Sequence, residues 1–545
     1  MADTEEAKVA GASSKVSSWA DDEPENAEEA PAKEKTEAEK AAEAKLQAER
    51  DEALAERFKA MEMNVNALHT GEILVRPAGK EEFTDSTDAS VDVVTSFSEL
   101  NIDEPIKKAV TSVKNWHTMS KIQQVGLPLI LKDPPTNFIG QAQAGTGKTG
   151  TFVISALARI TADKAPSRPQ AIILATTQEL VTQIATEVDS LGQFKGISAR
   201  RVMSSRSNGE FIDTPWALKR GEDFDEQVVV GTVGMVKNYL NNASGRRPKK
   251  PCIDASDVKV LVLDEADHLV SYPPHGFGDD VKSVRNSILS KRKGKTCQIL
   301  LFSATFTEEV KAIARNYVGD DKSQYAEVTL AKKDVTLDKV VNFFVLVDSG
   351  PHSSVEEVYV KKYEAILEIW ASLADYNLGQ SVIFVNTKNR AQNLAEFLRN
   401  QGYDVGQIHG NMPKDERERV FAEFKEGKRP ALVATNILSR GIDNPNVTLV
   451  INVDLPEKMA HNQSGFRDPD PETFVHRIGR SGRWTKKGAS VSLISPLPSL
   501  PDLSIMKEIE RQLFANEDVN RPMIQVPDPS QLGDALANNL EKISY

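Results

Sequence analysis

Three carboxylates lie close together in the segment KVLVLDEADHL, residues 259–269. Asp264, Glu265 and Asp267 follow the apolar run VLVL. Such a run is typical of a strand buried on both faces, and strands of this kind carry their functional residues just beyond the carboxyl end. The carboxylates either hold a ligand at that edge, or they begin the next helix, where the helix dipole favours negative charge.

A second segment, AQAGTGKTG, has the residue types of a phosphate-binding loop. It follows the apolar run NFIG and precedes TFVISALARI, which has a helical pattern, so it has the strand, loop and helix context that such loops require. Gly145 and Gly147 let backbone N–H groups approach phosphates closely. Lys148 can then reach the β- and γ-phosphates, and Thr149 can bind magnesium. The strict pattern has glycine where this chain has Ala142.

The two segments together predict a nucleotide site more specifically than either does alone. In phosphate-loop enzymes an Asp at the end of a second buried strand holds the magnesium ion, and a neighbouring carboxylate can orient the attacking water. Asp264 and Glu265 fit these two roles. Their distance from Lys148 along the chain is ordinary for one doubly wound sheet.

Two series of short apolar runs alternate with helical patterns and would position these residues. The first series is NFIG, AIILAT, QVVVGT, KVLVLD and QILLFSAT, and the second is VVNFFVLV, SVIFVNT, ALVAT, VTLVINVD and ASVSLIS. This alternation is typical of parallel sheets covered by helices. It predicts an α/β protein with two parallel-sheet domains, residues 91–330 and 341–545, joined by a linker at residues 331–340.

Residues 1–90 are expected to form an acidic, largely flexible extension that is partly helical. Residues 1–60 contain 17 Asp and Glu against 9 Lys and Arg and few large apolar residues, so they cannot build a core. Residues 37–62 have good helix formers and Glu/Lys pairs at helical spacing, which predicts a single solvated helix. Because the extension carries most of the net charge of -12, the rest of the chain can still hold a basic groove.

Composition also excludes several classes of protein. No apolar stretch approaches the roughly 18 to 20 residues that span a bilayer, and MADTEEAKVA lacks the features of a signal peptide, so we expect a soluble protein that is not secreted. The cysteines, Cys252 and Cys297, have neither zinc-ligand spacing nor a disulfide pattern.

The tetrapeptide DEAD at 264–267, with AQAGTGKT upstream and SAT downstream, resembles the signature motifs of the DEAD-box RNA helicases. FVNT, IHGNM, ATNILSRGID and HRIGRSGR follow in the family's order, and the resemblance covers roughly residues 95–500. It implies two RecA-like domains that close on ATP and single-stranded RNA, with Mg²⁺ as a cofactor. The implied activity is ATP hydrolysis coupled to local RNA unwinding or to removal of protein from RNA.

Two other functions remain as alternatives: an ATP-gated RNA clamp with little turnover, and a translocase that acts on DNA. The clamp is suggested by altered RNA-binding motifs. A clamp without turnover should have lost a catalytic group, whereas Glu265 is intact. The adenine-recognition segment that the family resemblance identifies also argues against both alternatives.

The resemblance assigns nucleotide contacts beyond the phosphate loop. Gln123 would pair with the edge of adenine, because an amide offers one donor and one acceptor group. Trp116 stands where the family usually has Phe stacked on the base, and Phe97 matches a more distant aromatic residue. Arg480 and Arg483 match the arginines that stabilise γ-phosphate charge. The remaining nucleotide-binding residues implied are Ala144, Thr146, Gly441 and Asp443.

The resemblance also assigns roles in catalysis, in interdomain coupling and in RNA binding. Asp264 would hold magnesium, mainly through water, and Glu265 would be the general base. The implied coupling residues are Asp267, Ser303, Thr305, His476 and Arg477. The implied RNA-binding residues are Gln178, Thr232, Gly234, Asn386, Thr387, Arg390, Thr435 and Gly441.

The chain departs from the family in the RNA-binding motifs of the first domain. Where the family reads Pro-Thr-Arg-Glu-Leu, this chain has Thr176, Thr177, Gln178, Glu179 and Leu180. The family's Thr-Pro-Gly is Thr-Val-Gly here, with Val233 in the middle. A neutral amide binds phosphate less strongly than a charged guanidinium, so we expect weaker RNA binding by this domain.

Within the family, DPDPETFVHRIGRSGR and PPTNFIGQAQAGTGKTGTF resemble the helicases of messenger RNA export at the nuclear pore. This resemblance implies a monomer in the cytoplasm and nucleus, at the cytoplasmic face of the pore. Its implied partners are messenger ribonucleoprotein, nucleoporins and an export activator with an inositol polyphosphate. It also suggests that a helix within residues 45–65 restrains domain closure.

Overall fold

The computed structural model describes most of the chain from Ile73 to Leu540. The described residues are 73–80, 82–86, 88, 91–142, 146–203, 206–207, 210–211, 223–241, 252–271, 276–306, 308–319, 322–330, 340–374, 379–438, 444, 446–458, 468–481, 488–513 and 523–540. The predicted N-terminal helix and nearly all of the predicted linker therefore lie outside them.

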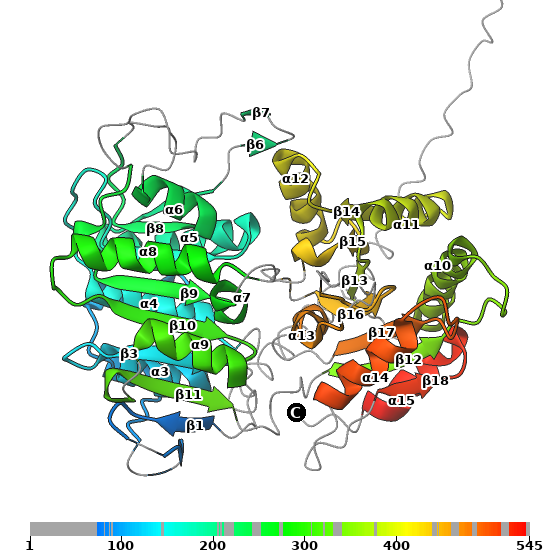
Figure 1. Cartoon of the computed structure of the whole chain (residues 1–545), viewed down its shortest axis with the longest axis horizontal. Coiled ribbons are helices and arrows are strands. Elements are labelled where there is room, and N and C mark those ends of the chain that lie inside the picture. Colours follow the sequence, from blue (N-terminus) through cyan, green and yellow to red (C-terminus); the bar gives the residue numbers. More distant parts are fainter. Residues whose placement is uncertain are drawn as a thin grey trace, which may run out of the picture. The chain divides into compact units, whose positions relative to one another are not determined.

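The first domain, coloured from blue to green in Figure 1, is built on a sheet that has nine strands among the described residues. In spatial order these are β2 (Thr84–Asp85), β1 (Ile73–Arg76), β11 (Tyr325–Leu330), β3 (Asn137–Gln141), β10 (Gln298–Ser303), β9 (Val260–Asp264), β4 (Ala171–Ala175), β8 (Val228–Thr232) and β5 (Ala199–Val202). From β11 to β5 all neighbours are parallel. By contrast, β1 pairs antiparallel with β11 and with β2, so part of the range 1–90 joins this sheet.

Helices of the first domain follow most of the parallel strands. They are α2 (Glu104–Ser112), α3 (Lys121–Leu131), α4 (Lys148–Arg159), α5 (Gln178–Gly192), α6 (Val233–Asn241), α7 (Ala266–Val270), α8 (Gly278–Lys291) and α9 (Glu308–Val318). A separate pair of very short strands, β6 (Arg206–Ser207) and β7 (Glu210–Phe211), is antiparallel.

Strand β9 shows why its sequence is continuously apolar. Val260 and Val262 belong to one buried cluster with residues of α3, α4 and α5. Leu261 and Leu263 belong to a second cluster with residues of α6, α7 and α8. Successive side chains of a strand point to opposite faces, so both faces of β9 are covered by helices. The prediction of a strand buried on both faces is confirmed.

The second domain has a sheet of seven strands among the described residues, and all its neighbours are parallel. In spatial order these are β14 (Val405–Ile408), β15 (Ala431–Ala434), β13 (Gln380–Phe384), β16 (Val447–Asn452), β17 (Gly488–Ile494), β12 (Val340–Leu346) and β18 (Ile524–Val526). Its helices are α10 (Val355–Ser372), α11 (Lys388–Asn400), α12 (Lys414–Lys425), α13 (Pro471–Ile478), α14 (Asp502–Leu513) and α15 (Leu532–Leu540). The predicted α/β class with two parallel sheets is confirmed.

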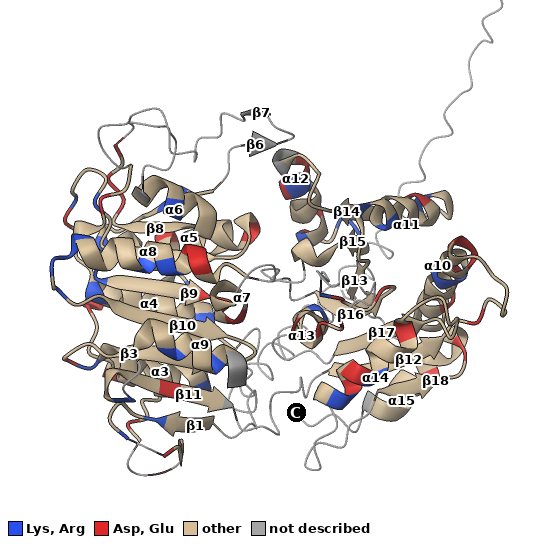
Figure 2. Cartoon of the chain, in the orientation of Figure 1, with Lys and Arg blue, Asp and Glu red and all other residues tan. Residues whose placement is uncertain are grey.

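Charged residues of both signs lie mainly on the helices and loops of each domain, and the strands are largely free of them (Figure 2). This distribution fits sheets that are covered on both faces, because an unpaired charge between sheet and helix would lose its hydration. No described helix is long and apolar enough to cross a membrane.

Candidate active site

The carboxyl ends of three neighbouring strands bring the predicted nucleotide site together. β10 lies between β3 and β9, with Ser303 opposite Gln141 and Phe302 opposite Asp264. The phosphate loop follows β3, and the DEAD segment begins at the end of β9. Because these strands are parallel, residues far apart in the sequence meet at one edge of the sheet.

Lys148 begins α4 and faces the acidic end of β9. Its Nζ donates a hydrogen bond to the Ala142 carbonyl at 2.5 Å. The side chain keeps some surface exposure, yet burial among protein atoms lowers the pKa of its ammonium to about 8. The charges of Asp264, Asp267 and Glu265 oppose this lowering. Lys148 is therefore a cation held partly out of water, which strengthens its attraction for a phosphate.

Asp264 is buried, with 5% of its surface exposed. Burial, together with the negative charge of Glu265, raises the pKa of its carboxyl to about 7. The ammonium of Lys148 and the backbone N–H of Glu265, which donates to Asp264 Oδ1 at 3.0 Å, act in the opposite direction. A carboxyl group whose pKa lies near neutral pH, beside a cation, is typical of a functional site.

Glu265 adopts a backbone conformation that is rare for a residue with a side chain. Its φ is 53° and its ψ is 50°, in the left-handed region. It stands just before α7, but its side chain makes no capping hydrogen bond to that helix. Instead, Glu265 Oε2 accepts a hydrogen bond from the Thr176 hydroxyl. Glu265 and Asp267 do stand at the start of α7, as the alternative for this acidic segment expected, but the Glu265 carboxylate bonds to Thr176 and not to the helix.

Asp267 lies at a contact between residues of the two domains. Its Oδ2 accepts a hydrogen bond from the Thr305 hydroxyl at 2.7 Å, and His476 Nε2 lies 3.1 Å from the same oxygen. Thr305 N–H in turn donates to Ser303 Oγ at 3.2 Å. All four side chains are buried. Four of the five predicted coupling residues are thus brought together, and the fifth, Arg477, makes its contacts elsewhere.

The residues predicted to bind adenine lie against the start of α4. Gln123 Oε1 accepts from Ser120 N–H at 2.9 Å, and its Nε2 lies 3.4 Å from the Gly147 carbonyl oxygen. A methyl group at Gly150 would come within 2.8 Å of the Trp116 ring and 3.0 Å of Gln123 Nε2. Gly150 therefore permits this close approach, a role that sequence reasoning did not assign. The Trp116 and Phe97 rings stack with centroids 6.4 Å apart.

The first-domain residues predicted to bind RNA gather at the ends of β4 and β8, which are paired with Ala175 opposite Thr232. Gln178 is the first residue of α5, and its Oε1 is buried without a hydrogen-bond partner among the described residues. Gly234 lies in α6, and a methyl group at this position would meet nothing within 4 Å. Packing of the described residues therefore does not require glycine at this position.

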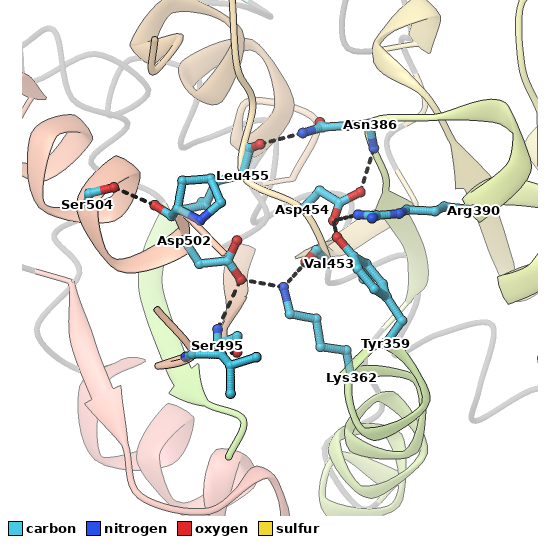
Figure 3. Close-up of polar contacts among 12 residues, drawn as sticks. Tyr359, Lys362, Asn386, Arg390, Val453, Asp454, Leu455, Ser495, Asp502 and Ser504 are labelled. Atoms are coloured by element: carbon cyan, nitrogen blue, oxygen red, sulfur yellow. Dashed lines mark hydrogen bonds and ion pairs between the residues drawn. The ribbon is translucent and has the colours of Figure 1, made fainter. Parts of the chain in front are cut away.

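In the second domain, Asp454 is the centre of a buried polar network (Figure 3). Its Oδ2 accepts from Asn386 N–H at 2.8 Å, and its Oδ1 accepts from Arg390 Nη1 at 3.1 Å and from the Tyr359 hydroxyl. The Arg390 guanidinium carbon also lies 3.5 Å from the centre of the Tyr359 ring. Asn386 Nδ2 donates to the Leu455 carbonyl at 2.8 Å. Two predicted RNA-binding residues are therefore held by side chains that the sequence did not reveal.

A fully buried lysine on α10 supports this network from below in Figure 3. Lys362 Nζ donates to the Val453 carbonyl and to Asp502 Oδ2, both at 2.7 Å. The same Asp502 oxygen accepts from Ser495 N–H at 3.0 Å. The ion pair ties α10 to the start of α14, and the hydrogen bond to Val453 ties α10 to the segment that carries Asp454.

Arg477 is fully buried within the second domain. Its guanidinium donates to Asn386 Oδ1 at 2.8 Å and to the Asp454 carbonyl at 2.6 Å, and it also donates to the Asn436 side chain. Burial lowers the pKa of Arg477 to about 10. Arg477 therefore holds loops of its own domain, whereas the neighbouring His476 makes the contact with the first domain.

The structure places the other predicted residues as follows. Thr149 lies in the first turn of α4, Thr387 is the N-cap of α11, and Thr435 directly follows β15. Arg480 is buried, and its Nε donates to the His476 carbonyl at 2.9 Å. Thr146 lies next to the N-cap of α4, and Thr232 ends β8. Ala144, Gly145, Gly441, Asp443 and Arg483 lie outside the described residues.

Comparisons with known proteins agree with this geometry. Residues 120–313 match the DEAD/DEAH box helicase family, and residues 361–485 match the helicase conserved C-terminal domain. The chain is 37% identical over 402 residues to the ATP-dependent RNA helicase dbp5 of Botryotinia fuckeliana, covering 74% of this chain and 75% of that relative. It is 31% identical over 450 residues to dbp5 of Schizosaccharomyces pombe, covering 82% and 78%.

Solved structures show the same similarity. The structure of S. cerevisiae Dbp5 bound to RNA and ADP BeF3 matches with a TM-score of 0.67 at 29% identity, covering 83% of this chain and all of that one. A variant of that protein bound to a variant of gle1 and to IP6 matches with a TM-score of 0.60 at 29% identity, covering 82% and 99%.

The buried ion pair of the second domain gives a test of stability. Asp502→Asn leaves the Lys362 ammonium buried without its counter-charge, so we expect the second domain to lose about 3 to 5 kcal/mol of its free energy of unfolding. Glu508→Gln is the matched control, because it breaks an exposed ion pair with Arg511 on the same helix. Urea unfolding of each full-length variant measures the effect. Equal losses in both variants would contradict the role given to the buried pair.

Proposed function

The chain belongs to the DEAD-box family of ATP-dependent RNA helicases, and we propose that it separates short RNA duplexes or displaces protein from RNA during messenger RNA export. The observation that supports hydrolysis most directly is that Lys148 lies with the buried Asp264 and Glu265 at one edge of the first sheet. This arrangement offers a cation for phosphates, a carboxylate for a metal and a second carboxylate for a water molecule.

The donor set at this edge fits magnesium. Mg²⁺ prefers oxygen ligands and commonly takes one or two protein groups together with phosphates and water. The buried Asp264 carboxyl and the Thr149 hydroxyl are oxygen donors at the ends of β9 and at the start of α4. These two residues would hold the ion, and the ion would neutralise charge on the β- and γ-phosphates when bound.

The chain's own residues would do the remaining chemistry. Lys148 binds the phosphates, the N–H groups at the start of α4 face them, and Glu265 takes a proton from the attacking water. Arg480 and Arg483 stabilise charge on the transferred phosphoryl group, as arginine fingers do. Because these arginines belong to the second domain, hydrolysis requires that domain, and the contact of Asp267 with His476 couples the two.

RNA binding is proposed at the strand ends of both domains. Gln178, Thr232 and Gly234 serve in the first domain, and Asn386, Thr387, Arg390, Thr435 and Gly441 serve in the second. The buried, unpartnered Oε1 of Gln178 can accept a hydrogen bond from a ribose hydroxyl. Since Gln178 replaces a cationic residue of the family, the first domain binds RNA phosphates less strongly.

The cellular role rests on the similarity to dbp5 proteins. One yeast relative is bound to gle1 and IP6, so a gle1-like activator with an inositol polyphosphate is the partner proposed here. We also propose that the chain acts as a monomer on messenger ribonucleoprotein, in contact with nucleoporins at the cytoplasmic face of the pore. Inhibition by a helix within residues 45–65 belongs to the same proposal.

Steady-state ATP hydrolysis with and without single-stranded RNA tests the enzymatic function. We expect RNA to stimulate turnover, and Glu265→Gln to lower kcat by about 10² to 10⁴, because it removes the general base. Glu99→Gln, which changes an exposed carboxylate in the same domain, is the control. RNA binding with negligible turnover by the unaltered chain would favour the ATP-gated clamp, and stimulation by DNA alone would favour the translocase.

The raised pKa of Asp264 predicts proton release when ATP and Mg²⁺ bind. At pH 6 the carboxyl is mostly protonated, because its pKa is about 7, whereas the cation requires the carboxylate. Binding should therefore release more protons from the unaltered chain than from Asp264→Asn at pH 6, and this difference should vanish at pH 8.5. Calorimetry in buffers of different ionisation enthalpy measures both values. An equal proton count for the two proteins at pH 6 would refute the assignment.

The effect of having Gln178 in place of the family's arginine can be tested by restoring the arginine. Gln178→Arg should tighten binding of single-stranded RNA and increase the salt dependence by about 0.7 in log–log slope for each phosphate neutralised. Gln193→Arg adds the same charge beyond the far end of α5 and serves as the control. Fluorescence anisotropy across a salt series measures both quantities. If the two variants behave alike, residue 178 does not face the strand.

A further inference from the structure

Thr176 makes a contact with the catalytic carboxylate that the family pattern does not supply. It is the first residue after β4 and stands where the family has proline. Its hydroxyl donates a hydrogen bond to Glu265 Oε2. Proline has no side-chain donor, so a chain with proline at this position cannot make this bond.

The pairing of strands explains why these two residues meet. β4 and β9 are parallel neighbours, with Leu174 opposite Leu263. Thr176 and Glu265 each lie two residues beyond that pair, at the same edge of the sheet. Each residue directly follows the last residue of its strand, and the parallel pairing brings these two strand ends side by side.

The contact restrains a carboxylate whose backbone is already restrained. The left-handed conformation of Glu265 determines where its side chain begins. Thr176 is β-branched, so few rotamers compete with the one that makes the bond. Among the described residues, no donor is bonded to the other carboxylate oxygen, Oε1, which leaves that oxygen for a water molecule.

Charge also favours a neutral donor at this position. Asp264 adjoins Glu265, and the two negative charges repel one another. A hydroxyl group stabilises the carboxylate without adding a second cation beside Lys148, which must remain available for phosphates. A cationic residue at position 176 would compete for the same carboxylates.

We propose that Thr176 is a positioning residue for hydrolysis, which fixes Glu265 through Oε2 so that Oε1 faces the attacking water. This inference rests on the role of Glu265 as general base. The residue acts on turnover, because its hydroxyl bonds to the base. A chain with proline at this position must orient its catalytic carboxylate through other contacts.

Three substitutions at this position test the proposal in the full-length chain. Thr176→Val keeps the shape without the donor, Thr176→Ser keeps the donor, and Thr176→Pro introduces the residue of the family. We expect Val and Pro to lower the RNA-stimulated kcat by about three- to tenfold, while the KM for ATP stays within about twofold. Ser should restore more than half of the lost kcat.

Two controls separate this proposal from the one on which it depends. Thr111→Val removes an exposed threonine hydroxyl that bonds only to helix carbonyls, and it should leave kcat unchanged. Glu265→Gln tests the general base itself: if that variant remains active, the proposed role of Glu265 fails. Suppose that Glu265→Gln is inactive while Thr176→Val and Thr176→Pro turn over like the unaltered chain; then only the role of Thr176 is overturned. The same holds if the kcat of Thr176→Ser is as low as that of Thr176→Val. Thermal unfolding confirms that each variant is folded.

Discussion

The first domain depends on keeping one ammonium and three carboxylates together at a sheet edge where water is scarce. Burial lowers the pKa of Lys148 and raises that of Asp264, so both pKa values lie closer to neutral pH than they would in water. Each charge is tolerated because the opposite charge lies nearby. The parallel register of β3, β10 and β9 makes this possible, since it delivers the charged residues to the same place.

The second domain uses buried charge for a different purpose. Lys362, Asp502 and Asp454 have partners within the domain, and their bonds join α10 and α14 to the loops after β13 and β16. Such a network specifies one arrangement of the loops, because every alternative leaves a buried group unpaired. The charges at the active edge of the first domain face a ligand site, whereas this network bonds groups of one domain to one another.

Sequence patterns predicted the parts of the fold that depend on local information. The continuous apolar runs of β9 and β4 identified buried strands, and the phosphate loop and DEAD segment identified the nucleotide edge. Sequence reasoning missed contacts between distant residues: Thr176 and Glu265 are 89 positions apart, and Lys362 and Asp502 are 140 apart. It also missed β1, because this short strand pairs antiparallel at the margin of an otherwise parallel sheet.

At Glu265, which has a left-handed backbone, selection for stability and selection for catalysis favour different residues. Glycine would adopt that conformation without steric cost, whereas a residue with a Cβ atom loses roughly 1 to 2 kcal/mol. A change to glycine would therefore relieve strain in the folded chain, and it would also delete the carboxylate. Selection for stability alone would favour glycine at this position. The glutamate is therefore kept for its carboxylate, and the fold bears the cost of its backbone strain.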